Sequence, residues 1–367
     1  MNATIPTRGP VCWCGCRDLH PYCTDYRACR DCGTLVSSAG LTAEEIVVRD
    51  DDHDFYGKTY WLGHQTADLG LPDITRRARA DAGERCMHWL WALLQFKLPP
   101  ARVLDVGCAH GGLVALARWA GYDATGLEMS PWVVELARRT FAVPMLQGTV
   151  ERQQLPERSF DAIVLNDVLE HLADPAGTVG HCARLLKDDG VLLIQTPCYP
   201  EGTSLQELRD RKDRFLEMMD GMARQHLYLF SRRAVGRLLA GLGFEAVEFL
   251  PALFVYDMYL VAARRAVARA DREALSAALA ASPEGRMTLA WLDFLEVSEV
   301  READRAARLD LILRLDGTLR QSEAARQALQ AEVDRLRGAA NQAVILPAVE
   351  SLRPGWLRSL RRLLRAG

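Results

Sequence analysis

The sequence lacks the features that would indicate a membrane span, a secretory route or a polyanionic partner. No apolar run reaches the roughly 18 residues that a spanning helix needs, and the longest candidate, residues 249–263, contains Asp257. The first residues show no charged segment followed by an apolar one, so no secretory signal is indicated. Lys and Arg number 45 against 48 Asp and Glu, which makes nucleic acid an unfavoured partner. We expect a soluble cytoplasmic protein.

Cysteine is abundant at one end of the chain only. Ten cysteines are present, and six of them lie within the first 32 residues. Without a secretory signal, such a cluster is more typical of metal ligands than of disulfides. Cys29 and Cys32 are spaced as a zinc knuckle, and Gly33 allows the tight turn beneath the ion.

The partner pair of this knuckle is less clear from the spacing. Cys12 and Cys14 are our choice, Cys12 with Cys16 also fits, and Cys16 and Cys23 stand in reserve. The alternative to a metal site is a reduced, loosely ordered tail. The predicted ligands of a closed structural Zn²⁺ site are Cys12, Cys14, Cys29 and Cys32.

The centre of the chain alternates between two kinds of pattern. Short runs rich in Val, Ile and Leu alternate with amphipathic segments from residue 101 to about 265, which indicates a mostly parallel sheet covered on both faces. Residues 246–250 and 254–262 could close that sheet as a hairpin. Residues 74–96 are predicted to form one helix before it. Ligands of such sheets bind at the carboxyl ends of the strands.

A glycine-containing loop follows the first predicted strand. Gly107 and Gly111 permit a tight turn and close approach of the backbone to a ligand. The spacing fits neither a dinucleotide fingerprint nor a phosphate loop, which disfavours hydride and phosphoryl transfer. Glu128 ends the next strand about twenty residues later, where a carboxylate can accept hydrogen bonds from two ribose hydroxyls. The pattern predicts a nucleoside-like ligand without a pyrophosphate.

Several motifs in order resemble those of class I S-adenosylmethionine-dependent methyltransferases. Residues 105–111 match the first motif of that family, with Ala109 in place of the central glycine, and residues 159–172 (SFDAIVLNDVLEHL) resemble its fourth-strand segment. Residues 185–197 resemble a third stretch. This resemblance implies an α/β, Rossmann-like fold: a seven-stranded methyltransferase sheet whose last strand is antiparallel.

The same resemblance implies S-adenosyl-L-methionine as cofactor. Glu128 would hold the ribose, the backbone of residues 107–111 the methionine portion, and residues 148–150 would lie near the adenine. Asn166 and Asp167 would face the sulfonium, and Asp105 would order the loop. The predicted cofactor-binding residues are Asp105, Gly107, Ala109, Gly111, Glu128, Met129, Thr149, Val150, Asn166 and Asp167.

Two histidines are candidate catalytic residues. Methyl transfer needs chiefly the alignment of acceptor and methyl, and a base is required only if the acceptor must lose a proton. His226 is preferred narrowly over His171, because His171 could instead cap the helix that follows Asp167. His110, within the glycine loop, is expected to face solvent or the edge of the ligand.

The cysteine knuckle and an aromatic run at residues 55–61 (FYGKTYW) are together similar to a bacterial subgroup. Its members carry a zinc ribbon before the methyltransferase domain, and some modify sugars or cell-surface glycans. The leading prediction is methylation of a small-molecule or glycan-linked acceptor, such as a sugar hydroxyl. The alternatives are a non-catalytic scaffold of a membrane-associated glycan assembly and an RNA-directed methyltransferase, the latter disfavoured by the lack of a dense basic patch.

The C-terminal part is helical in pattern. Apolar residues step by three and four from Ile312 to Leu336, which indicates either a coiled coil for self-association or a long helix packed on its own domain. From Ser351 onward five arginines occur without an acid, so a basic amphipathic helix could contact the inner membrane surface peripherally or dock on the protein itself. The predicted segments are a zinc-ribbon-like cysteine cluster (1–40), a linker and helical cap (41–100), the methyltransferase-like domain (101–265), a helical segment (266–300), the coiled coil (301–338) and the basic tail (339–367).

Overall fold

The computed structural model describes residues 10–351 except 69 and 71. The described residues fall into two compact units, one ending at Asp293 and one beginning at Phe294. Residues 352–367, which hold most of the predicted basic tail, lie outside the described residues.

A seven-stranded sheet forms the centre of the first unit, in the order β10-β11-β8-β7-β4-β5-β6. Only β11 runs against the other strands, because it is antiparallel to both of its neighbours. The predicted Rossmann-like sheet and its antiparallel last strand are therefore confirmed. The strands are β4 (Arg102–Val106), β5 (Asp123–Glu128), β6 (Met145–Gln147), β7 (Phe160–Asn166), β8 (Leu186–Pro197), β10 (Ala246–Leu250) and β11 (Asp257–Ala263).

Helices cover the sheet and connect its strands. On one face, apolar side chains of α6 and α8 share a core with Leu104 and Ile163. The predicted helix over residues 74–96 is in fact two helices, because the backbone leaves the helical conformation at Glu84 (φ −122°, ψ −87°) directly after Gly83. The helices of this part are α2 (Ile74–Gly83), α3 (Arg85–Phe96), α4 (Gly112–Trp119), α5 (Pro131–Phe141), α6 (Pro175–Leu185), α7 (Leu205–Arg211) and α8 (Arg232–Gly241).

Short helical segments lie at the loop ends that surround the carboxyl edge of the sheet. The aromatic run at residues 55–61 leads into a π-helix, η1, and the segment after β7 forms a single 3₁₀ turn, η3. The short segments are α1 (Ala43–Ile46), η1 (Thr59–Asp68), η2 (Val150–Arg152), η3 (Leu169–His171) and η4 (Arg214–Met218).

A second, four-stranded sheet joins the N-terminal residues to the central domain. Its order is β1-β2-β3-β9, and all of its pairings are antiparallel. The strands β1 (Leu19–Pro21), β2 (Tyr26–Cys29) and β3 (Leu35–Ser37) belong to residues 10–41, which we call the ribbon, whereas β9 (Tyr228–Leu229) comes from the segment before α8. The ribbon is thus built onto a strand that lies nearly two hundred residues further along the chain.

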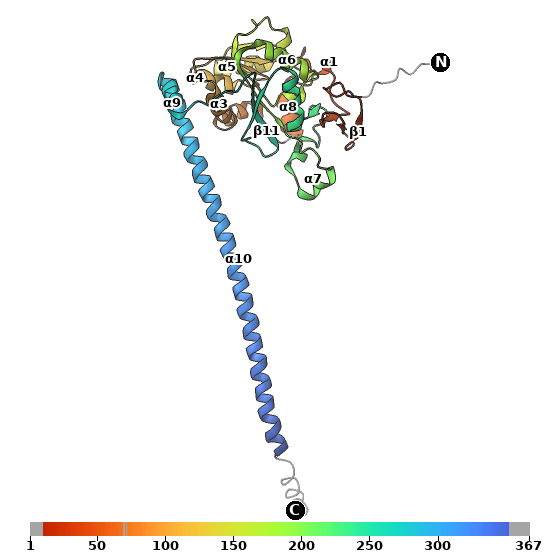
Figure 1. Ribbon diagram of the computed structural model, residues 1–367, viewed down its shortest axis with the longest axis vertical. Coiled ribbons are helices and arrows are strands. Elements are labelled where there is room, and N and C mark those ends of the chain that lie inside the picture. The colour runs from red at the N-terminus through yellow and green to blue at the C-terminus, as the bar shows by residue number, and fades with distance from the viewer. Residues whose placement is uncertain (1–9, 69, 71, 352–367) are drawn as a thin grey trace, which may run out of the picture. The chain divides into compact units, whose positions relative to one another are not determined.

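Two helices, α9 (Arg272–Ala280) and α10 (Pro283–Ser351), complete the described chain. The helix α10 continues without a break through Gly317 and enters the second unit (Figure 1). The side chains of Ile312, Leu315, Leu319, Leu329, Val333 and Leu336 are each more than a third exposed. Within the described residues, no helix is both long and apolar enough to cross a membrane.

Candidate active site

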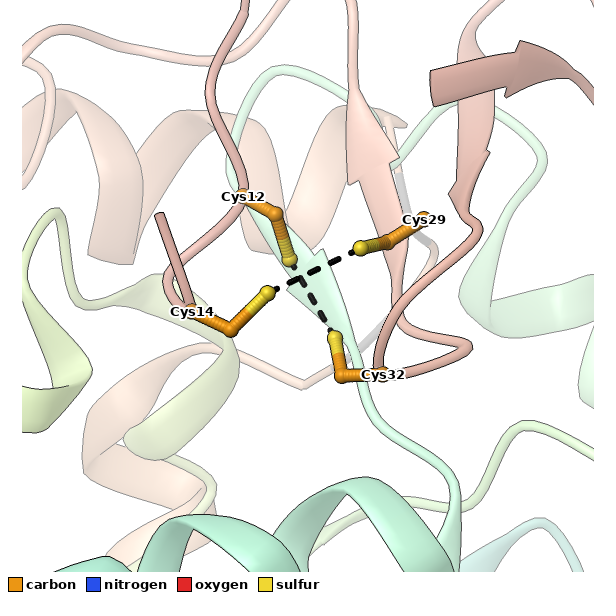
Figure 2. A group of neighbouring side chains, drawn as sticks. All are labelled: Cys12, Cys14, Cys29 and Cys32. Carbon is orange, nitrogen blue, oxygen red and sulfur yellow. Dashed lines mark hydrogen bonds between the residues drawn. The ribbon is translucent and has the colours of Figure 1, made fainter. Parts of the chain in front are cut away.

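Four cysteines of the ribbon point their sulfurs toward one centre (Figure 2). The Sγ atoms of Cys12 and Cys32 are 3.4 Å apart and those of Cys14 and Cys29 are 3.7 Å apart. All four sulfurs lie within 4.8 Å of one another. A tetrahedral Zn²⁺ with bonds of about 2.3 Å needs sulfurs roughly 3.8 Å apart, so the four thiols fit this ion.

The ribbon backbone explains why these four cysteines meet. Two turns present them, with Gly15 at φ +84° after the first pair and Gly33 at φ +78° after the second, conformations that favour glycine. Cys16, the alternative partner of Cys12, instead contacts the carbonyl of Asp18 at 3.7 Å, and it lies outside the four-sulfur group.

The predicted glycine loop lies between β4 and α4 and has the backbone shape that its residues suggested. Gly107 has φ +72°, and a Cβ there would lie 2.5 Å from Cγ2 of Val168. Ala109, at the position where the family motif has glycine, also adopts a left-handed conformation (φ +45°). Gly111 begins α4 and packs against α5 rather than lining a cavity.

Glu128 connects the end of β5 to this loop. Its carboxylate accepts hydrogen bonds from the backbone N–H groups of Met129 (2.8 Å), Ser130 (3.2 Å) and Ala109 (3.2 Å). The side chain is buried, and burial raises its pKa. Burial and the charge of Glu128 together raise the pKa of Asp105 to about 8.

A cavity of about 320 Å³ adjoins these residues. The predicted cofactor residues that line it are Gly107, Glu128, Met129, Thr149, Val150 and Asp167. Tyr56, Tyr60 and Trp61 also line this cavity, although the sequence indicated no cofactor role for them. The aromatic run at residues 55–61 was the feature of the sequence that could have indicated their role. Asp51 ties that segment to the start of α5, because its carboxylate accepts hydrogen bonds from Ser130 Oγ (2.6 Å) and Trp132 N (2.7 Å).

A second cavity, of about 420 Å³, shares Tyr60, Trp61, Gly107, Asp167 and His171 with the first. Apart from Gly111, it holds the remaining predicted residues, namely Asp105, Ala109, Asn166 and His226. Arg85, which the sequence analysis did not predict, also lines it, paired with Asp167 at 3.0 Å.

Of the two positions expected for His110, the solvent-facing one is wrong, because the side chain is 5% exposed. His110 instead lines the larger cavity, and its Nε2 lies 3.1 Å from a carboxylate oxygen of Asp81. Arg77 also pairs with Asp81, at 3.3 Å. Asp81 belongs to α2, so its contact with His110 connects this helix to the glycine loop.

The two candidate histidines lie together in the larger cavity, with ring centroids 5.0 Å apart. Nδ1 of His171 is 2.9 Å from the carbonyl oxygen of Gln225, and Nδ1 of His226 is 2.8 Å from that of Met218. Since a carbonyl can only accept, each Nδ1 carries the hydrogen and each Nε2 keeps a lone pair. Nε2 of His171 is 3.8 Å from the carboxylate of Glu170.

Burial disfavours the protonated form of both histidines. Burial and the nearby His171 lower the pKa of His226 to about 3. Burial also lowers the pKa of His171, but the hydrogen bond to Gln225 and the charge of Asp167 oppose that shift. The cap of α6 is Asp174, whose side chain accepts from Gly177 N, so His171 does not cap that helix. His171 therefore lies in the cavity beside His226 and is not occupied as the cap of α6.

The larger cavity also contains polar groups that lack partners within the described residues. Both amide atoms of Asn166, Oε1 of Gln225 and Nε1 of Trp61 are buried without a hydrogen bond. All three side chains line this cavity. Buried polar groups are nearly always hydrogen-bonded, so these atoms favour a polar ligand or ordered water here.

Residues 76–248 match the model of a family described as a methyltransferase domain. This part of the chain is therefore similar to a methyltransferase domain. The match begins in α2, before the boundary at residue 101 that the sequence analysis predicts, and so includes Arg77, Asp81 and Arg85.

The methyltransferase domain is similar to curated relatives. Ubiquinone biosynthesis O-methyltransferase of Xanthomonas campestris pv. campestris is 34% identical over 129 residues, which cover 32% of this chain and 54% of the relative. The protein of the same description from Xylella fastidiosa is 38% identical over 110 residues, or 27% and 43% of the two chains. The chain thus spans about half the length of the curated relatives it matches. Among solved structures, a possible histamine N-methyltransferase of Thermotoga maritima is 19% identical, with a TM-score of 0.38 over 52% of this chain and 91% of that one.

Proposed function

We propose that the protein transfers a methyl group from S-adenosylmethionine to a hydroxyl of a small-molecule or glycan-linked acceptor. The observation that carries this proposal is the junction of the two cavities at Gly107 and Asp167. One cavity has the carboxylate and glycine cradle for a nucleoside, and the other has two neutral histidines beside unpartnered polar groups. Cofactor and acceptor would meet at that junction.

The residues around the smaller cavity fit S-adenosylmethionine. Gly107 leaves a cradle that a Cβ would fill, and the buried carboxylate of Glu128 is placed for ribose hydroxyls. Thr149 and Val150 would flank the adenine. The cofactor supplies a methyl group on a positively charged sulfur, which is a good leaving group.

At the acceptor end, His171 is the better base. Its Nδ1 is hydrogen-bonded, so its Nε2 lone pair can take the proton of a hydroxyl. Burial lowers the pKa of both histidines, but the hydrogen bond to Gln225 and the charge of Asp167 oppose this shift at His171, whereas the pKa of His226 falls to about 3. His226, Asn166 and Gln225 would orient the acceptor by hydrogen bonds.

The charge balance of the larger cavity bears on the acceptor. Six carboxyl groups line it against two guanidinium groups, but burial raises the pKa of Asp105 and of Asp257 to about 8 and also raises the pKa of Glu170. The charges in the cavity are therefore nearly balanced, which suits an uncharged acceptor without excluding an anionic one. The curated relatives are named O-methyltransferases, which supports oxygen as the methylated atom. A sugar or glycan acceptor rests on the resemblance of the ribbon and the aromatic run to the bacterial subgroup.

Calorimetric titration with S-adenosylhomocysteine tests the cofactor. We expect micromolar binding that Glu128→Ala weakens at least tenfold, because a buried ribose contact is lost. Glu135→Ala, an exposed acid on the neighbouring α5, should bind as the wild type does. No binding by folded wild-type protein would overturn the enzyme proposal and favour the scaffold.

The four cysteines hold a structural Zn²⁺ in this proposal, and four thiolates leave no open position for catalysis. Purified protein should contain one equivalent of zinc by elemental analysis, and Cys14→Ser should lose it. Cys23→Ser changes a thiol outside the four-sulfur group and should retain the metal.

A second copy of the chain would cover the exposed apolar stripe on α10. Ile312, Leu315, Leu319, Leu329, Val333 and Leu336 occupy heptad positions, interrupted by Ser322 and Arg326. Light scattering of the full chain should give a dimer, and Leu315→Lys with Leu319→Lys should give a monomer. Gln327→Lys lies off the stripe and should leave the dimer intact. A monomeric wild type would contradict this partner.

A further inference from the structure

We infer that the metal-bound ribbon positions the acceptor end of the active site and is dispensable for the cofactor end. The link is residues 218–230, which we call the acceptor wall. Met218, Met222, Gln225 and His226 of this wall line the larger cavity. This inference rests on the proposed function, but its test is independent of the acceptor's identity.

The acceptor wall has little structure of its own. Between η4 and β9 it is a series of turns without a helix or strand. The position of Gln225 and His226 therefore depends on what holds the backbone from outside. On the domain side, Leu227 N donates to the carbonyl of Glu170 (2.8 Å), Nδ1 of His171 donates to that of Gln225 (2.9 Å), and Tyr199 N donates to that of Phe230 (2.7 Å).

The ribbon holds the wall by its backbone. Strand β3 pairs with β9 through Leu35 opposite Leu229 and Val36 opposite Tyr228. Two more ribbon N–H groups continue the contact, from Ser37 to Leu227 O and from Leu41 to Arg224 O, each at 2.9 Å. The wall is thus an edge of the ribbon sheet.

Two ribbon side chains reach the residues that carry the acceptor groups. The fully buried Tyr26 donates its hydroxyl to the carbonyl of His226 at 3.2 Å. Ser37 Oγ donates to the carbonyl of Ala223 at 2.5 Å. These contacts hold the backbone on one side while the imidazole of His226 lies in the cavity. Tyr26 and Ser37 are therefore positioning residues.

The four sulfurs connect these contacts to the metal. Cys29 ends β2, the strand of Tyr26, and Cys32 directly precedes the approach to β3. Cys12 and Cys14 come from a loop without regular structure whose Trp13 packs against Phe230, with ring centroids 6.2 Å apart. A bound ion would join the loop of Cys12 and Cys14 to the β2–β3 hairpin. The wall would then be held both by Trp13 against Phe230 and by the pairing of β3 with β9.

The cofactor end has no such connection. None of residues 10–41 lines the smaller cavity, whose carboxylate and glycine cradle belong to β5 and the loop after β4. Loss of the metal should therefore release the acceptor wall and leave the binding of S-adenosylhomocysteine unchanged.

The test is hydrogen exchange on full-length protein before and after zinc is removed with a thiol-specific mercurial and a chelator. We expect amide exchange in residues 218–230 to accelerate at least tenfold, exchange in residues 126–130 to stay within twofold, and added Zn²⁺ to restore protection. Calorimetry on the same samples should show S-adenosylhomocysteine affinity within twofold. Unchanged exchange in residues 218–230, or loss of cofactor affinity together with zinc, would overturn the inference.

A variant that retains zinc distinguishes the loss of the ribbon's contacts with the wall from unfolding of the whole ribbon. Tyr26→Phe with Ser37→Ala removes both side-chain contacts and leaves all four cysteines in place. It should keep one equivalent of zinc, accelerate exchange in the wall by a smaller factor, and shift the NMR resonances of the His226 ring. If those resonances and the exchange match the wild type, the ribbon does not position the wall. Failure of wild-type protein to bind S-adenosylhomocysteine would instead reject the proposed function and leave the exchange result standing.

Discussion

The two ends of the candidate site are built in different ways. The cofactor end comes from two adjacent parallel strands and consists of backbone turns plus one carboxylate, Glu128. The acceptor end is assembled from η1, η3 and the acceptor wall, and it depends on the side chains of His171, His226 and Gln225. The first is local and rigid, whereas the second needs outside support. Substitutions at each end should therefore fail in different ways.

The largest effect is expected at the acceptor end. His171→Gln keeps a hydrogen-bonding side chain but removes the base, so we expect kcat to fall by roughly 10²–10⁴-fold. Affinity for S-adenosylhomocysteine should stay within about twofold. The measurement is steady-state kinetics once an acceptor is found, beside calorimetry on the same samples. His20→Gln, an exposed histidine of β1, is the control. If cofactor affinity fell as much as kcat, His171 would contribute to cofactor binding and the two ends of the site would not act separately.

The next effect is expected in the backbone of the cofactor end. In Gly107→Ala the new Cβ would lie 2.5 Å from Val168 at φ +72°, so we expect a loss of at least roughly 1–2 kcal/mol of unfolding free energy. Cofactor affinity should fall with it. Gly236→Ala in α8 meets no atom within 4 Å and should instead stabilise the protein by roughly 0.5–1 kcal/mol. Urea unfolding measures the change in unfolding free energy for each variant. Equal changes in the two variants would show that the loop does not require glycine at position 107.

How far the site could be predicted from sequence follows the same division. Gly107 and Glu128 lie at the ends of two successive strands of one strand–helix–strand unit, so the glycine loop and a carboxylate about twenty residues later located them, in agreement with the family resemblance. Arg77 and Arg85 line the larger cavity from a helical segment whose spacing carries no signal. Tyr56 lines the smaller cavity from the aromatic run, which was recognised but given no role in cofactor binding. The contact of His110 with Asp81 was not predicted, because Asp81 belongs to a helix that precedes the glycine loop by some thirty residues. The pairing of β3 with β9 joins residues far apart in the chain, and no local pattern predicts it.

Opposite pH dependence should sharpen the comparison. The pKa of Asp105 is raised from 3.8 to about 8, so the folded state keeps a proton that the unfolded state loses, and stability falls as the pH rises between those values. The pKa of His226 is lowered from 6.5 to about 3, so the unfolded state binds the extra proton, and stability falls as the pH drops through that range. Asp105→Asn should flatten the first slope and His226→Gln the second, measured by urea unfolding from pH 4 to pH 8. Identical slopes in both variants would show that neither group titrates as its burial implies.

The smallest effect is expected at Ala109, where the family motif has glycine. Its φ of +45° costs a residue with a Cβ roughly 1–2 kcal/mol, while glycine at the same position makes the unfolded chain more flexible by roughly 0.4–1 kcal/mol. Ala109→Gly should therefore stabilise the fold by about 1 kcal/mol or less. Because the backbone N–H of residue 109 still donates to Glu128, cofactor affinity should be unchanged. Thermal unfolding and calorimetry check both parts. A tighter binding of S-adenosylhomocysteine would mean that the alanine methyl restrains the cradle as well as the loop.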